Sequence, residues 1–454
     1  MLAYLDYLIN KFRPFFQVFA LGMFLFSGSL IYFLRDGIGL AKGSTAFTLS
    51  LMVGPMLLYF PFINFKKLYV PNVVSYKLSA AFILLGFIYL MLYAPNRGWF
   101  TNTYYEIGVM LVIAYLYLFL ASVSINALNK YFVQTAIIIS GLGSFLFLIY
   151  LLRNPYYVLG STRASITFGN SDTEGFGNPH IFAKVAFLGF VASVVFMGKI
   201  KNIIFKLANF ACILIFIVVL VLTQSMTTIA TTLLFLGLYL YFNLTLLNVY
   251  KTGKRILTSP VFWVLTSFFI YKAHQFYIYN TGMIVNVTLA ITKRIDVLLE
   301  TFFPFLYRND AISGVFRQRI DGSASARIDN FATLTNTFTT NLSEGNILPL
   351  LFGNGYHKLY VDVPVLETLH SFGLIGFILF NSFFIYISWQ ALKEMRKPQS
   401  IATEFIAYAY LYYMLYTFSG GLIIDYIRWG FFAFVCRFLP VTLKKVDKQP
   451  IADQ

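Results

Sequence analysis

Long apolar runs separated by short polar segments dominate the pattern of this chain. Twelve runs are almost free of charged residues. Each is about 18 to 22 residues long, which is the length that a helix needs to cross a hydrocarbon core of roughly 30 Å. The predicted membrane-spanning helices cover 14–34, 46–63, 76–94, 105–124, 131–152, 181–198, 203–223, 226–247, 257–278, 366–389, 401–419 and 424–442.

Two polar segments interrupt this pattern, at 153–180 and at 279–365. Connections longer than about 15 residues are uncommon unless they are functional or disordered. The longer segment keeps apolar and aromatic residues throughout, so its composition is not that of a disordered tail. The pattern divides the chain into N-terminal spans (1–152), a polar loop (153–180), central spans (181–278), a large loop (279–365), and C-terminal spans with a tail (366–454).

Composition agrees with a polytopic membrane protein, because 59% of the residues are hydrophobic and only 11% are charged. The basic residues then predict on which side of the membrane each loop lies, since Lys and Arg in short loops stay in the cytoplasm. Seventeen of them fall on the side of the N-terminus and five in the opposite short segments, which places both long polar segments outside the cytoplasm. The net charge of +16 is dispersed over short loops. It therefore predicts topology, not a nucleic-acid partner.

No motif for a metal, a nucleotide or a redox cofactor occurs in the chain. Its two cysteines, Cys212 and Cys436, both fall inside predicted spans, where a thiol acts as a small hydrophobic group. The patterns CxxC, HExxH and GxxxxGK[ST] are missing from the sequence. We therefore expect neither a cofactor nor a metal site.

The large loop begins with an amphipathic stretch at 291–302 that predicts a helix on the membrane surface. A run rich in arginine and aspartate follows it. Guanidinium groups fork onto phosphate oxygens, so this run predicts binding of a phosphorylated lipid head group. The alternative is a set of surface pairs between arginine and aspartate, each of which contributes little. The arginines of this run are Arg308, Arg317, Arg319 and Arg327.

Ionisable residues also mark the entry to the tenth predicted span. Asp362, Glu367 and His370 stand at its start, and the spacing of the last two places them on one helical face. Ionisable groups this close to hydrocarbon are costly and indicate a site, and burial adjusts a carboxylate to act as a general base. The alternative is a carboxylate at a helix terminus that pairs with a histidine.

Asn178, Pro179 and His180 predict the beginning of the sixth span. Pro179 suits the first turn of a helix, and Asn178 suits its cap. His180 then lies at the positively polarised end of that helix, which favours an anion. Lys184 follows one turn later, and we expect it to face the same anionic ligand.

Taken together, these elements resemble the O-antigen polymerase and ligase superfamily over residues 150–385. Arg163 precedes a polar segment that ends in Asn178-Pro179-His180, and Arg327 precedes the turn LLFGNG at 350–355. The sequence Gly373-Leu374-Ile375-Gly376 then enters a span. Ligases of this superfamily carry a His-Asn pair where this chain has Asp362, and a Ser-Arg-Gly signature where it has 224–227. Both differences favour a polymerase over a ligase.

The resemblance implies an all-α, polytopic glycosyltransferase of the GT-C kind with about twelve transmembrane helices and a large periplasmic loop. It implies a bacterial inner-membrane location, with the active site facing the periplasm. The implied partners are undecaprenyl-diphosphate-linked glycans as donor and acceptor, membrane lipid, and a chain-length regulator protein. Neither a metal nor a nucleotide sugar is required.

The resulting hypothesis gives catalytic roles to Arg163, Arg327, Asp362, Glu367 and His370. The two arginines neutralise the departing diphosphate, and one of the other three deprotonates the acceptor hydroxyl, with inversion at the anomeric carbon. Two alternatives are an O-antigen ligase and a flippase or other transporter. Scarce charge within the predicted spans counts against a transporter. The expected substrate-binding residues are Arg153, Asn178, His180, Lys184, Arg317 and Arg319.

Overall fold

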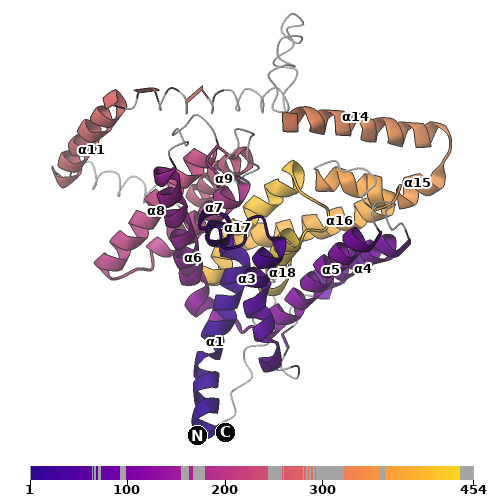
Figure 1. The fold of residues 1–454 in the computed structure, drawn as a ribbon, viewed down its shortest axis with the longest axis horizontal. Helices are drawn as coiled ribbons and strands as arrows, with labels where there is room; N and C mark the ends of the chain where they lie inside the picture. Colours follow the sequence, from indigo (N-terminus) through magenta and orange to yellow (C-terminus); the bar gives the residue numbers. More distant parts are fainter. Residues whose placement is uncertain are drawn as a thin grey trace, which may run out of the picture.

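The structure, a computed structural model, describes residues 2–63, 73–92, 99–154, 163–166, 179–243, 260–279, 322–356 and 363–439, with a few isolated positions beside them. Every regular element in this described part is helical (Figure 1). Eight helices are long and apolar enough to cross a membrane, and a bent pair at the N-terminus would make nine. The chain is therefore an α-helical polytopic membrane protein.

Nine of the predicted spans coincide with these helices. The bent pair joins α1 (Leu2–Phe26) to α2 (Gly28–Tyr32) and the π-helical turn η1 (Phe33–Gly37), and the others are α3 (Thr45–Leu58) with η2 (Phe60–Phe62), α4 (Val73–Leu92), α5 (Trp99–Ser122), α6 (Ile125–Arg153), α7 (Pro179–Met197), α8 (Ile203–Thr223), α9 (Met226–Asn243) and α16 (Pro364–Arg396). Three more predicted spans correspond to α11 (Pro260–Tyr279), α17 (Ile401–Ser419) and α18 (Tyr426–Phe438), which are not among the eight. The total of twelve spans stays a prediction.

Helix α17 lies at the centre of the bundle, where it contacts α6, α7, α9, α16 and α18 (Figure 1). Its residues from Phe405 to Tyr413 are all buried. Because other helices surround it instead of lipid, this helix accommodates polar side chains that find partners inside the bundle. The hydroxyl groups of Tyr410 and Ser388, for example, lie 2.7 Å apart. A central position therefore suits the tyrosine hydroxyls of α17, which face other helices instead of lipid.

The first predicted span is bent, not straight. Its two parts, Phe12–Phe26 and Gly28–Gly37, meet at an angle of 68°. Beyond the bend, Arg35 is buried and pairs with Asp36 at 2.6 Å, and its Nη1 donates to the Thr48 hydroxyl at 2.9 Å. Arg35 is one of the five basic residues that the sequence predicts to lie in the short segments opposite the cytoplasmic side. Its burial in η1 with a carboxylate partner corrects that assignment.

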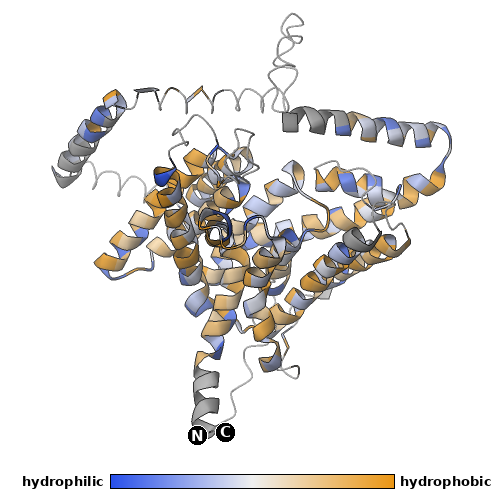
Figure 2. Ribbon diagram, viewed as in Figure 1, coloured by the Kyte–Doolittle hydropathy of each residue, from blue (hydrophilic) through white to orange (hydrophobic). Residues whose placement is uncertain are grey.

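The second half of the large loop contains two helices that the sequence did not predict. Helix α14 (Gly322–Ser343) and the short helix α15 (Ile347–Phe352) lead toward α16, and α14 contacts both α15 and α16. Figure 2 shows α14 as more polar than the helices of the bundle. The predicted amphipathic helix at 291–302 lies outside the described residues, apart from one isolated position.

Candidate functional site

The segment 163–166, which carries Arg163, lies against the C-terminal end of α8. The backbone N–H of Ala164 donates to the carbonyl of Leu222 at 3.0 Å. Ala164 and Ile166 are buried, whereas Arg163 is partly exposed. The two buried side chains anchor this short stretch in the bundle. Arg163 lies beside them and remains partly exposed at the surface.

His180 contacts the same end of α8 from a different helix. Helix α7 begins at Pro179, which confirms the predicted helix start. The His180 Nδ1 lies 3.1 Å from the Ser225 hydroxyl, to which the Thr228 hydroxyl donates at 3.0 Å. Ser225 belongs to the two-residue connection between α8 and α9, in which Gln224 adopts a left-handed conformation with φ 47°. The last turn of α8 therefore holds the segment of Arg163, and the connection after it holds the start of α7.

Arg153 is the last residue of α6 and is exposed. It borders a surface hollow of about 400 Å³ that Gly37 and Tyr150 also line. The side chain of Ile166 lies near the same hollow, since a Cβ atom added to Gly37 would lie 3.6 Å from the Cδ1 of Ile166. Arg153 and the segment of Arg163 therefore border one region at the end of the bundle. We call Arg153, Arg163 and His180 the cationic cluster.

Lys184 lies one turn beyond His180, inside α7, and is only 7% exposed. It interacts electrostatically with Asp425. Asp425 caps the start of α18, where its carboxylate accepts from the backbone N–H groups of Ile427 and Arg428, both at 3.3 Å. The sequence predicted that Lys184 faces an anionic ligand. The structure gives it an internal carboxylate partner, and contact with a ligand stays a prediction.

Glu367 and His370 lie in the first turns of α16, and both are buried, Glu367 completely. Near them the Tyr356 hydroxyl donates to the Glu106 carboxylate at 3.1 Å, and Tyr356 also interacts electrostatically with Glu367. Burial, together with these carboxylates, raises the pKa of Tyr356 well above its ordinary value. The phenol therefore stays protonated and acts as a donor. We call Glu106, Tyr356, Glu367 and His370 the carboxylate cluster.

Sequence reasoning missed Glu106, because a single acidic residue at the start of an apolar run carries no spacing signal. Its partner Tyr356 stands 250 positions away in the chain. The one available signal was its charge within a predicted span, which is costly unless the group has a partner or a function.

Two glycines of the LLFGNG and GLIG motifs cross backbone to backbone beside this cluster. Gly353 has φ 78° and Gly373 has φ 63°, and a Cβ atom on either would lie 2.5 Å from the backbone nitrogen of the other. The N–H of Asn354 donates to the carbonyl of His370 at 2.8 Å, in the turn that ends just before Tyr356. Gly373 interrupts the helical conformation of α16. The crossing therefore joins the turn to the helix that carries Glu367 and His370.

A series of electrostatic interactions leads from Lys184 in α7 to the carboxylate cluster. Asp425, the partner of Lys184, also acts on Tyr105 in α5, and Tyr105 acts in turn on Tyr356. These interacting side chains belong to α7, the cap of α18, α5, the turn before α16, and α16 itself. In order, the series consists of Lys184, Asp425, Tyr105, Glu106, Tyr356 and Glu367.

Several predicted site residues lie outside the described part of the chain. Arg327 belongs to α14, but only its backbone is described. The structure therefore brings together Glu367 and His370, and it brings Arg153, Arg163 and His180 to one end of the bundle. The predicted residues without a description are Asn178, Arg317, Arg319 and Asp362.

Several charged residues lie buried in the folded bundle, some of them within the predicted spans. Windows of mean hydropathy conceal single charges, and each of these charges finds partners in the folded bundle. Arg428, for example, is completely buried and donates to the carbonyls of Gly420 at 2.6 Å and Leu422 at 2.5 Å. The buried charged residues in the described chain are Arg35, Asp36, Glu106, Lys184, Glu367, Glu394, Arg428 and Arg437.

Comparison with known proteins identifies no relative. No family model matches the chain, and neither a curated protein nor a solved structure matches it. Within the residues that the structure describes, no three His, Cys, Asp or Glu side chains lie close enough together to hold a metal ion.

Replacing Tyr356 by phenylalanine is expected to destabilise the protein by about 1–3 kcal/mol, because a buried carboxylate then loses a donor. The measurement is the midpoint of thermal unfolding of the purified protein in detergent. Tyr279→Phe is the matched control, since Tyr279 is 83% exposed on α11. Equal midpoints for both variants would contradict the role given to the bond between Tyr356 and Glu106.

Proposed function

We propose that this protein polymerises undecaprenyl-diphosphate-linked oligosaccharide repeat units at the periplasmic face of a bacterial inner membrane. The observation that carries the proposal is the carboxylate cluster, in which the buried Glu367 and His370 of α16 lie beside the bonded pair Tyr356 and Glu106, while Arg153, Arg163 and His180 lie where α6 ends, α8 ends and α7 begins. Glycosyl transfer from a diphosphate needs both: positive charge for the leaving group and a base for the acceptor.

The cationic cluster serves the donor. As the bond between the anomeric carbon and the diphosphate oxygen breaks, negative charge grows on undecaprenyl diphosphate. Arg153 and Arg163 offer guanidinium groups that fork onto phosphate oxygens. His180 adds an exposed imidazole at a helix N-terminus, where anions are favoured. Arg317, Arg319 and Arg327 of the large loop are proposed to complete this side.

The carboxylate cluster serves the acceptor. The oxygen of an acceptor sugar hydroxyl attacks the anomeric carbon and inverts it, and its proton passes to Glu367, His370 or Asp362. Glu367 is completely buried and interacts electrostatically with Tyr356, which places it inside the carboxylate cluster.

The crossing of Gly353 and Gly373 supports the resemblance to the O-antigen polymerase and ligase superfamily. Those glycines carry two of its motifs, and hydrogen bonds join them to the start of α16. The two motifs are apart in the sequence, but their backbones are in contact next to the candidate base. The missing His-Asn pair and Ser-Arg-Gly signature still favour a polymerase over a ligase.

A transporter or flippase is the second candidate, and one observation favours it. Ionisable residues buried within helices are typical of substrate and proton pathways. Arg35 with Asp36, and Lys184 with Asp425, are such residues. A flippase would move the lipid-linked unit across the bilayer of a proteoliposome without changing its length.

The deciding experiment incubates the purified protein with a lipid-linked repeat unit alone. A ladder of longer products, together with released undecaprenyl diphosphate, is expected from a polymerase. Products that form only after addition of lipid A-core identify a ligase. Transfer of the unchanged unit to the opposite leaflet, with no new glycosidic bond, identifies a flippase and overturns the proposal.

A further inference from the structure

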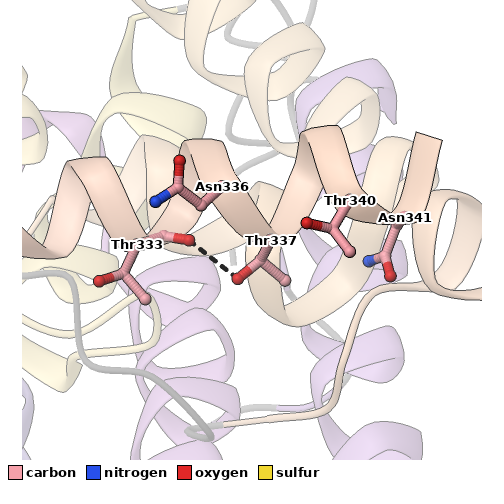
Figure 3. Close-up of a pocket in the computed structure, with 5 residues that line it drawn as sticks. All are labelled: Thr333, Asn336, Thr337, Thr340 and Asn341. Carbon is pink, nitrogen blue, oxygen red and sulfur yellow. Dashed lines mark hydrogen bonds between the residues drawn. The ribbon is translucent and has the colours of Figure 1, made fainter. Parts of the chain in front are cut away.

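Helix α14 carries an extended face of amide and hydroxyl groups. From Asn330 to its end at Ser343, the helix contains no ionisable side chain. Five residues on one side line a shallow surface hollow of about 350 Å³, which Figure 3 shows in close-up. At 100° per residue they fall on one face of the helix. We call Thr333, Asn336, Thr337, Thr340 and Asn341 the amide–hydroxyl face.

Helix stability does not account for this composition. Threonine and asparagine are less favourable than alanine in a helix, by up to about 0.7 kcal/mol each. The hydroxyl of Thr337 donates to the carbonyl of Thr333 at 2.8 Å, a local bond that adds no tertiary contact (Figure 3). Charged residues with high helix propensity are the usual choice for an exposed helix. Helix stability therefore does not explain why threonine and asparagine occupy this face. The explanation lies in the chemistry that these side chains offer at the surface.

The amide–hydroxyl face belongs to the same structural unit as the carboxylate cluster. Leu334 of α14 is only 5% exposed, and the helix contacts α15 and α16. Helix α15 ends at the crossing of Gly353 with Gly373, and α16 begins next to Glu367. A ligand that extends from the carboxylate cluster along these helices would meet α14 next.

We propose that the amide–hydroxyl face binds neutral sugar residues of the glycan chain, away from the reacting carbon. This inference rests on the proposed polymerase function. Amide and hydroxyl groups both donate and accept hydrogen bonds, which matches the alternating donors and acceptors of sugar hydroxyls. A face without charge neither attracts anionic lipid head groups nor excludes an uncharged glycan.

Exposure of the face determines how it acts. Single hydrogen bonds on an exposed surface contribute little each, and several together hold a chain while still allowing it to shift by one repeat. The face would then retain a long chain between successive additions and leave the joining of two single units unaffected. Polymer length, not the rate of the first coupling, is the quantity that it controls.

The test compares two sets of threonine and asparagine substitutions on the same helix. The first variant combines Thr333→Ala, Asn336→Ala, Thr337→Ala and Thr340→Ala. The control combines Thr335→Ala with Thr339→Ala, because both threonines are exposed on the opposite side and bond only the preceding turn, at 2.9 Å each. Alanine raises helix propensity, so both variants are expected to fold.

The first variant is expected to make polymer with a modal length reduced at least about two-fold, since several weak bonds are lost together. Its rate of forming dimers of the repeat unit is expected to equal that of the unchanged protein, and the control is expected to make polymer of full length. Full-length polymer from the first variant would overturn the inference. A ladder from the unchanged protein keeps that outcome separate from a failure of the proposed function.

A binding measurement tests the face without any turnover. The probe is the polysaccharide of the expressing cells, released from its lipid by mild acid and immobilised on beads. Retention of the unchanged protein and of the control, with loss of the first variant, is expected. Equal retention of all three proteins, or no retention of the unchanged protein, overturns the inference. So does retention that depends on a second, co-purifying protein, since the face then binds that protein.

Discussion

Replacing Gly373 by alanine is expected to prevent correct assembly of the protein, and Gly353→Ala is expected to do the same. A Cβ atom at either position would lie 2.5 Å from the backbone of the other segment, where no flexible side chain can give way. Both glycines also have positive φ angles, which alone cost a residue with a Cβ atom about 1–2 kcal/mol. Together these effects place the loss among the exceptional values above about 4 kcal/mol.

The measurement is the yield of monodisperse protein after extraction in detergent, followed by its thermal unfolding. Gly108→Ala is the matched control, since Gly108 lies in α5 and a Cβ atom there would meet nothing within 4 Å. Normal yield and an unchanged unfolding midpoint are expected for it. Well-folded Gly373→Ala protein would show that the backbone crossing is not required.

Replacing Arg163 by alanine is expected to lower the rate of polymer formation by about 10²–10³-fold, the loss typical of removing one group that stabilises charge in a transition state. Its backbone segment is held by the bond between the Ala164 N–H and the Leu222 carbonyl. We therefore expect the folded protein to persist with an unchanged unfolding midpoint. Arg163→Lys should recover part of the rate, because it restores the charge without the planar fork.

The assay for this variant is the ladder formed from the lipid-linked repeat unit. Arg396→Ala is the matched control, because Arg396 is exposed at the other end of α16 and has no place in the proposed site. Its ladder is expected to be normal. If Arg163→Ala gives the same ladder as Arg396→Ala, Arg163 does not bind the donor diphosphate.

The candidate site divides into residues that sequence motifs reveal and residues that only packing reveals. Glu367 and His370 were predicted because their spacing places them on one face at a helix start, and the structure places both in the first turns of α16. Glu106 and Asp425 were not predicted. Each is a single acidic residue with no neighbour in sequence to give it meaning, and its partners come from distant helices.

The motif glycines illustrate the same division. The sequence showed Gly353 and Gly373 as parts of two family motifs without a reason for either. Their close approach makes each the partner of the other, because only two residues without Cβ atoms allow these backbones to meet. No local pattern predicts such a contact, since it depends on the path of the chain between the two positions.

Hydrophobic pattern alone determined that the chain is a polytopic helical membrane protein, because the length of an apolar run and its freedom from charge are local properties that a bilayer tests directly. The same pattern predicted where nearly every described helix lies. Only the tertiary structure decided that α1 and α2 form a bent pair, that α17 is central, and that eight charged residues are buried. These features depend on which helices become neighbours, and a buried charge is tolerated only where a neighbouring helix supplies its partner.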